Sequence, residues 1–251
     1  MQVLIAPSAA AVGRFAAGRI ADVVRRRPDA VLGLATGSSP LDIYADLARQ
    51  VAAGELDLSA VRAFALDEYI GLPPGHPQSY HEVIDREVVR PTGMDPAKVR
   101  VPNGFAEDLE AACEEFEREL AEVGPVDVQI LGVGTNGHIG FNEPMSSFAS
   151  RTRVKRLTPA TRQANARFFD SIDQVPELCL TQGIGTVMEA EELLLVAQGA
   201  AKAEAVARMV EGPVSSSCPA SVLQFHPSAT VIVDGPAASR LEFTDYYERL
   251  S

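Results

Sequence analysis

Short apolar runs alternate with amphipathic segments along the chain, and this alternation limits the fold more than any other feature. Apolar runs of strand length lie at residues 2–6, 29–35, 61–66, 126–131, 190–196 and 229–234. Helical patterns cover residues 9–26, 41–51, 79–89, 108–123 and 199–210. Parallel strands need such crossovers. We therefore expect an α/β protein with a Rossmann-like three-layer fold and a mainly parallel central sheet.

The length of 251 residues suits one domain. No repeat, linker or low-complexity tract divides the chain, so we expect a single domain over residues 1–251. Residues 176–185 carry an irregular pattern, and residues 156–183 are a candidate mobile lid.

The composition limits location and partners. No apolar run approaches the roughly 20 residues of a membrane span. The first apolar stretch, residues 3–6, is too short for a signal peptide and has no basic residue before it. A net charge of -12 opposes binding to nucleic acid or to anionic membranes. We expect a cytoplasmic protein with no membrane or nucleic-acid partner.

The three cysteines predict neither a disulfide framework nor a metal site. Cys113, Cys179 and Cys218 are scattered and lack C-x-x-C spacing, so each is expected to be a small buried side chain. No histidine and aspartate cluster has metal-ligand spacing either. We therefore expect no metal.

A glycine-rich turn follows the apolar run at residues 126–131. Gly132, Gly134 and Gly137 fit the dinucleotide pattern G-x-G-x-x-G. The residues that follow disfavour a nucleotide, because Gly140 and Pro144 interrupt any cofactor helix. A basic run at 151–156 also stands where an acidic ribose ligand is expected. What remains is a glycine loop that presents His138 and Glu143 to a ligand.

Two other turns follow predicted strands. Thr36, Gly37, Ser38 and Ser39 precede Pro40, which suits a phosphate site with Ser39 as the helix N-cap, although an ordinary capped turn has the same pattern.

Asp67 and Glu68 directly follow the run at 61–66, at the carboxyl end of a predicted strand, where α/β sheets place their catalytic and binding residues. A solvated acidic turn is the alternative. All three turns should meet in one cleft at the carboxyl ends of the strands.

The residues of this cleft favour general acid–base chemistry. The chain has no G-x-S-x-G elbow and no Ser-His-Asp spacing, which disfavours nucleophilic hydrolysis. A carboxylate can move a proton beside a carbonyl, and a histidine held by a carboxylate can shuttle protons on a ring oxygen.

Four segments closely resemble the glucosamine-6-phosphate deaminase family. They are residues 66–72 (LDEYIGL), 132–144 (GVGTNGHIGFNEP), 150–155 (SRTRVK) and 161–169 (TRQANARFF). Their order and spacing match over nearly the whole chain, from the turn at Thr36 to residues 223–227.

The resemblance implies a cofactor-independent conversion of glucosamine 6-phosphate to fructose 6-phosphate and ammonia. Asp67 matches the base that moves a proton between C2 and C1. His138 matches the ring-opening acid–base residue, and Glu143 matches the carboxylate that orients it. Asn136 stands where some members carry aspartate, so Glu143 should bear more of the charge facing His138.

The resemblance also implies a phosphate site and an effector site. Ser38, Ser39, Arg167 and Lys202 match the phosphate site, and Thr36, Gly37 and Gly137 are expected to approach the substrate. Some members are hexamers that N-acetylglucosamine 6-phosphate activates at a site between subunits, and others are small and unregulated. A homo-oligomer is therefore one candidate state and a monomer is the other. Ser147, Arg153 and Lys155 match that effector segment, and a basic strand without a ligand is the alternative.

Two other functions stay open. A 6-phosphogluconolactonase-like hydrolase has a Gly-His loop in the same place, but the Asp67-Glu-Tyr and Phe141-Asn-Glu-Pro sequences favour the deaminase. A non-catalytic sugar-phosphate-sensing module is the other, although it has no need of Asp67 as a base.

Overall fold

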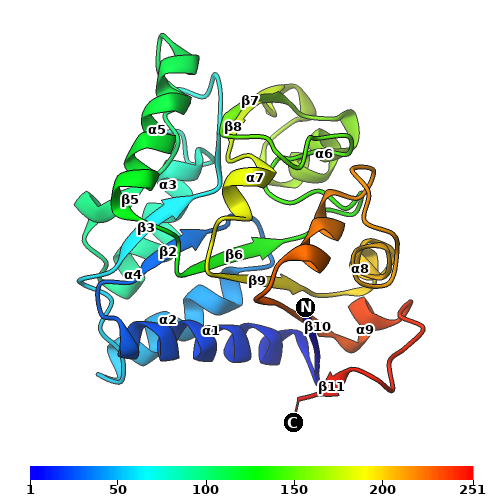
Figure 1. Cartoon of the computed structure of the whole chain (residues 1–251). Helices are drawn as coiled ribbons and strands as arrows, with labels where there is room; N and C mark the ends of the chain where they lie inside the picture. Colours follow the sequence, from blue (N-terminus) through cyan, green and yellow to red (C-terminus); the bar gives the residue numbers. More distant parts are fainter. Residues whose placement is uncertain (251) are drawn as a thin grey trace.

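An eight-stranded parallel sheet forms the centre of the protein, in a computed structural model that describes residues 1–250 (Figure 1). Its strand order is β11-β1-β10-β9-β6-β2-β3-β5, and every neighbouring pair is parallel. The strands are β1 (Gln2–Ala6), β2 (Val31–Leu34), β3 (Arg62–Ala65), β5 (Val99–Arg100), β6 (Val128–Gly132), β9 (Glu192–Ala197), β10 (Ala229–Asp234) and β11 (Glu248–Arg249). The predicted α/β class is confirmed.

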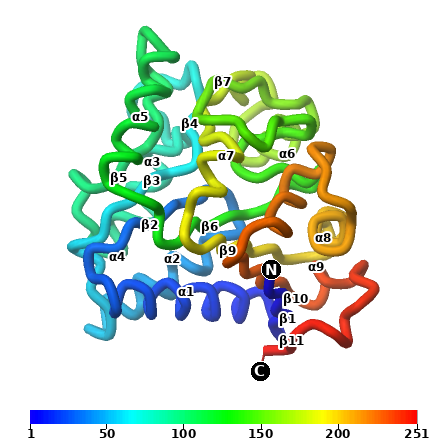
Figure 2. The backbone as a smooth tube through the Cα atoms, viewed as in Figure 1, coloured from blue at the N-terminus to red at the C-terminus, as the bar shows by residue number. Residues whose placement is uncertain are grey.

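Helices cover both faces of this sheet. In Figures 1 and 2, α1 and α2 run side by side below it, and α5 lies above. Ser8 and Asp108 cap α1 and α5, each accepting a backbone N–H three residues on. The α-helices are α1 (Ala9–Arg26), α2 (Leu41–Ala52), α3 (Tyr80–Ile84), α4 (Arg90–Thr92), α5 (Leu109–Val123), α6 (Pro159–Asn165), α7 (Ile184–Val187), α8 (Ala203–Val210) and α9 (Gly235–Ala238).

Shorter helical turns complete the layers. A π-helix spans Asp85–Val89, and 3₁₀ turns span Pro96–Lys98, Ala166–Phe168, Ile172–Gln174, Ala200–Lys202 and Pro219–Phe225. No helix within residues 1–250 is long and apolar enough to cross a bilayer.

The central strands are buried on both faces, as parallel strands under two helical layers must be. Ile130, Leu131 and Leu194 are fully buried in β6 and β9. All three cysteines are free, and their burial confirms the prediction that each is a small buried side chain.

A second, three-stranded antiparallel sheet has the order β4-β8-β7. Its strands are β4 (Asp67–Tyr69), β8 (Leu178–Thr181) and β7 (Arg153–Arg156). The prediction of irregular structure over 176–185 is therefore wrong, because this stretch contains β8 and the start of α7. Four residues are too few for a periodicity to separate a strand from a loop, and burial of Cys179, Leu180 and Thr181 decides the structure here.

Two local predictions need correction. Ser39 is not the N-cap of α2: Pro40 takes that position and makes no side-chain cap bond. The single helix expected over 79–89 is α3 followed by the π-helix, in which Arg90 N–H donates to Asp85 O, five residues back. Pro91 has no N–H to bond the fourth residue before it, which favours this wider turn.

Candidate active site

A cavity of about 380 Å³ opens at the carboxyl ends of β2, β3 and β6. In open α/β sheets, ligands bind at the carboxyl ends of the parallel strands, at the point where the strand order reverses. The predicted site residues that line the cavity are Thr36, Gly37, Ser38, Ser39, Asp67, His138, Arg167 and Lys202. Asn136, Gly137 and Glu143 lie outside this lining, although Asn136 and Glu143 contact His138.

Asp67 is a buried carboxyl in the cavity wall, only 4% exposed. Burial raises the pKa of Asp67 well above its usual range, the negative charge of Glu68 raises it further, and the Phe141 N–H acts in the opposite direction. A carboxylate with a raised pKa is a stronger base, as removal of a carbon-bound proton requires.

The neighbouring carboxylate points elsewhere. Glu68 is fully buried and accepts the backbone N–H groups of Tyr69 and Tyr80 at 2.7 and 2.8 Å. It also accepts the N–H of His81 at 2.9 Å, and so holds the first turn of α3 against β4. Alternation along the strand directs Asp67 to the cavity and Glu68 to the helix.

Glycines in the loop after β6 make room for His138. A Cβ at Gly134 would lie 2.2 Å from the His138 ring, and one at Gly137 would lie 2.6 Å from Cys218 Sγ. Gly137 also has a φ of 88°, which favours glycine. The Gly134 N–H donates to His138 O at 2.9 Å and closes the loop.

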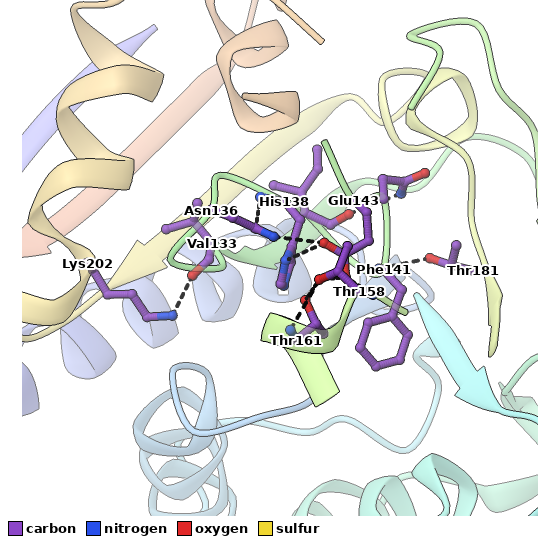
Figure 3. Close-up of polar contacts among 11 residues, drawn as sticks. Val133, Asn136, His138, Phe141, Glu143, Thr158, Thr161, Thr181 and Lys202 are labelled. Carbon is purple, nitrogen blue, oxygen red and sulfur yellow. Dashed lines mark hydrogen bonds and ion pairs between the residues drawn. The ribbon is translucent and has the colours of Figure 1, made fainter. Parts of the chain in front are cut away.

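The imidazole faces a carboxylate, and an amide holds both residues (Figure 3). His138 Nδ1 lies 3.6 Å from Glu143 Oε2, which is an ion pair when the ring is protonated but longer than a hydrogen bond. Asn136 Nδ2 donates to the same Oε2 at 2.8 Å, and Asn136 Oδ1 accepts the His138 N–H at 3.2 Å. Catalytic contacts of this kind commonly shorten when substrate binds.

The other oxygen of Glu143 reaches the start of α6. Glu143 Oε1 accepts from the N–H and the hydroxyl of Thr158 at 3.0 and 3.1 Å. Burial alone would raise the pKa of Glu143, but His138, the Thr161 hydroxyl and the Thr158 N–H outweigh it and lower the pKa to about 2. Glu143 is therefore ionised at neutral pH.

Two cations face the turn after β2. Arg167 Nη2 donates to Ser38 Oγ at 3.2 Å, and Lys202 Nζ donates to Val133 O at 2.6 Å. Burial, followed by the charge of Arg167, lowers the pKa of Lys202. Neither cation forms an ion pair with a carboxylate within residues 1–250, so their charge is available to an anion.

The effector-segment residues lie apart from this cavity. Arg153 and Lys155 are on β7, and Ser147 is in the preceding loop; none of them lines the cavity. No hydrogen bond within the described residues joins Ser147 to Arg153 or Lys155. Residues 1–250 hold no group of three or more His, Cys, Asp or Glu side chains that could bind a metal ion.

Some contact residues escaped the sequence reasoning. Thr158 is the N-cap of α6, and its position before Pro159 is a capping signal that could have identified it. Asn165 lines the cavity and donates to the Tyr69 hydroxyl at 2.9 Å, a long-range contact that no local pattern indicates.

The fold and the cavity define an α/β enzyme of sugar-phosphate chemistry. The chain belongs to the glucosamine-6-phosphate isomerases/6-phosphogluconolactonase family, whose model matches residues 6–232. It is 56% identical over 247 residues to the glucosamine-6-phosphate deaminase of Pseudarthrobacter chlorophenolicus, covering 98% of this chain and 95% of that protein. The deaminase of Streptomyces coelicolor is 54% identical over 248 residues, with the same two coverages.

Solved structures agree with this assignment. A monomeric glucosamine-6-phosphate deaminase superposes with a TM-score of 0.94 at 43% identity, covering 96% of this chain and all of that one (100%). The 6-phosphogluconolactonase of Trypanosoma brucei gives a TM-score of 0.74 at 18% identity, covering 96% of this chain and 98% of its own, which shows the shared fold alone.

Proposed function

We infer that the chain converts glucosamine 6-phosphate to fructose 6-phosphate and ammonia without a cofactor. The deaminases that it resembles over 98% of its length support this function. The single observation that carries it is the cavity, which brings the buried Asp67 carboxyl, the His138 ring and the cations Arg167 and Lys202 to one small space.

The first step opens the sugar ring. We propose that protonated His138 gives a proton to the ring oxygen as the C1–O5 bond breaks and takes the proton of the C1 hydroxyl, which gives the open-chain aldehyde. Glu143 is ionised and faces His138, so it fixes the orientation of the ring. Asn136 holds Glu143 in place.

The second step moves a proton between two carbons. We propose that Asp67 removes the proton from C2, which leaves an enolamine with the negative charge on the C1 oxygen, and returns it to C1 while an amine proton passes to that oxygen. The product is an imine at C2, which water hydrolyses to fructose 6-phosphate and ammonia. The buried position of Asp67 keeps the carboxyl poorly solvated and basic enough for this transfer.

We propose that the phosphate binds between the turn after β2 and the two cations. Arg167 already contacts Ser38, and Gly37 has a φ of 89° that suits close approach of backbone to an anion. Lys202 lines the same cavity, close enough to Arg167 for that charge to help lower the pKa of Lys202. An acidic protein needs such a local concentration of positive charge to hold a dianion.

We also propose that residues 156–183 act as a mobile lid of a single domain. Asn165, Arg167 and Phe168 come from this segment and line the cavity, so its displacement would open the site. Hydrogen exchange of the segment with and without fructose 6-phosphate tests this proposal. Equal exchange in both samples would contradict it.

A regulatory role of β7 is a further proposal. Arg153 and Lys155 take part in no ion pair within residues 1–250, whereas the flanking Arg151 and Arg156 do. The charges of Arg153 and Lys155 are therefore available to the phosphate of N-acetylglucosamine 6-phosphate. An oligomer would be needed if the site lies between subunits. Ammonia release and molecular mass, each measured with and without the effector, test both points. A cytoplasmic location fits an enzyme whose phosphorylated substrates do not cross membranes unaided.

The test of the main function makes three measurements on the purified protein: deamination, lactone hydrolysis and sugar-phosphate binding. Glucosamine 6-phosphate should yield ammonia and fructose 6-phosphate in equal amounts. Hydrolysis of 6-phosphogluconolactone in its place would favour the hydrolase, and sugar-phosphate binding without turnover would favour a sensing module.

A further inference from the structure

Thr181 is a fully buried threonine that lies opposite Asp67 in the β4–β8 pair. Opposite residues of antiparallel strands project to the same face, with Cβ atoms about 4.5–5.5 Å apart. Two bonds fix this register beyond Thr181: Gln182 N donates to Leu66 O at 2.7 Å, and Gln182 Nε2 donates to Ala65 O at 3.0 Å. Thr181 does not line the cavity, so its effect on the site must pass through its neighbours.

The hydroxyl of Thr181 contacts the end of the glycine loop. Phe141 N–H donates to Thr181 Oγ1 at 3.1 Å (Figure 3). At the preceding residue, a Cβ on Gly140 would lie 3.1 Å from Thr181 Oγ1 and 3.4 Å from Asp67 Oδ2. The loop that carries His138 and the strand that carries Asp67 therefore meet at Thr181.

We propose that Thr181 is a positioning residue for the proton transfer by Asp67, an inference that rests on the proposed function. Its hydroxyl holds the Phe141 amide and so sets the separation between the Asp67 carboxylate and the His138 loop. Asp67 and His138 act on the same sugar in turn, so one separation must suit both C2 and the ring oxygen. An error of about 1 Å in such a separation can cost 10²-fold in rate.

The same hydroxyl also affects the charge of the base. The pKa of Asp67 is raised by burial and by Glu68, and is lowered by the Phe141 N–H. Without the Thr181 hydroxyl, the Phe141 N–H has Asp67 as its remaining acceptor, and the carboxylate becomes a weaker base. The other titratable groups facing Asp67 stay the same: Glu68 and Tyr69 of β4, Tyr80 of α3, Cys179 of β8 and His138 across the cavity.

The test uses Thr181→Val, which removes the hydroxyl at constant volume, and Thr181→Ser, which keeps it. The rates are measured with ordinary substrate and with substrate deuterated at C2, and their ratio is the isotope effect. With ordinary substrate, the valine variant should lose about 10- to 100-fold in kcat, with KM little changed. Its isotope effect should increase and the acidic limb of its pH profile should move to lower pH, because proton transfer becomes slower and the base weaker. The serine variant should recover most of the wild-type rate and isotope effect.

Thr186→Val is the matched control. Thr186 is a buried threonine whose hydroxyl donates to Glu117 at 2.6 Å, away from the cavity. Its loss should lower stability without moving the isotope effect or the pH profile. Should Thr181→Val fail to fold, Thr181→Ala removes the same hydroxyl and must give the same result.

Three outcomes separate the inference from the function on which it rests. Wild-type protein that releases no ammonia would overturn the proposed function itself. Active wild type with an unchanged isotope effect and pH limb in the variants lacking the Thr181 hydroxyl would overturn the role of Thr181 alone, as would a serine variant as impaired as the valine variant.

Discussion

Asn136 donates a hydrogen bond to Glu143 at 2.8 Å, and this bond holds the carboxylate that faces His138. The position is neutral, so Glu143 supplies the negative charge of this group. Because Asn136 also accepts the His138 N–H at 3.2 Å, one side chain fixes both partners of the ion pair. The expectation that asparagine here leaves the charge to Glu143 is consistent with this arrangement.

Removing this amide should slow the enzyme. Asn136→Ala leaves Glu143 Oε2 without its donor, which should cost about 1–3 kcal/mol of stability because the bond involves a charged group. We expect kcat to fall about tenfold with a small change in KM, since the loss concerns the orientation of His138 rather than phosphate binding. Steady-state kinetics measure both. Gln2→Ala removes another amide that donates to a carboxylate, that of Glu248 at 3.1 Å, exposed and outside the cavity; it is the control and should change neither value.

The low pKa of Glu143 predicts acid sensitivity. This pKa falls from 4.5 to about 2 on folding, so the ionised group stabilises the fold fully above pH 4.5 and loses that contribution as the pH falls toward 2. Glu143→Gln should therefore unfold more easily than wild type at pH 7. Denaturant titrations at several pH values should show the difference shrinking below pH 4.5, whereas a constant difference would contradict the assignment.

The raised pKa of Asp67 predicts the opposite dependence of folding stability on pH. Because its pKa is raised in the folded state, its ionisation destabilises the fold as the pH increases through that value. Asp67→Asn should therefore be more stable than wild type at neutral pH, because the amide removes the buried negative charge. The gain should vanish toward pH 3.8, the ordinary value for this side chain. Thermal unfolding across this pH range measures it, and a less stable variant at pH 7 would argue against a desolvated carboxylate.

Arg167→Ala should act on substrate binding. We expect KM for glucosamine 6-phosphate to increase at least tenfold, because a charge-assisted contact contributes about 1.5–3 kcal/mol. Preference for the phosphorylated over the free sugar should largely disappear. Arg156→Ala removes another exposed arginine, paired with Glu177 and outside the cavity, and serves as the control. An unchanged preference in Arg167→Ala would place the phosphate elsewhere.

Local periodicity was enough to predict six of the eight strands of the main sheet and the longer helices, but not β5 and β11, which have two residues each. Residues 2–6, 9–26 and 229–234 were predicted with the bounds that the structure has, because each run keeps one pattern throughout and ends at turn residues. The carboxyl-end cleft also followed from the order of strands and helices. These features depend on residues close together in the chain.

The small sheet could not be predicted in the same way. β4 and β8 are short, and their pairing joins Asp67 to Thr181 across more than a hundred residues. The contact of Glu143 with Thr158 likewise needs the fold to bring the glycine loop to the start of α6. Ser39 as a cap failed for a related reason, since Pro40 can itself occupy the N-cap position.

The most direct test of the account is the fate of glucosamine 6-phosphate with wild-type protein and with Asp67→Asn. The wild type should release ammonia and fructose 6-phosphate in equal amounts, and the variant should lose at least 10³-fold in kcat while it still binds the phosphorylated sugar. A wild type without ammonia release, or an Asp67→Asn variant of near-normal rate, would contradict the assignment of Asp67 as the proton-transfer base.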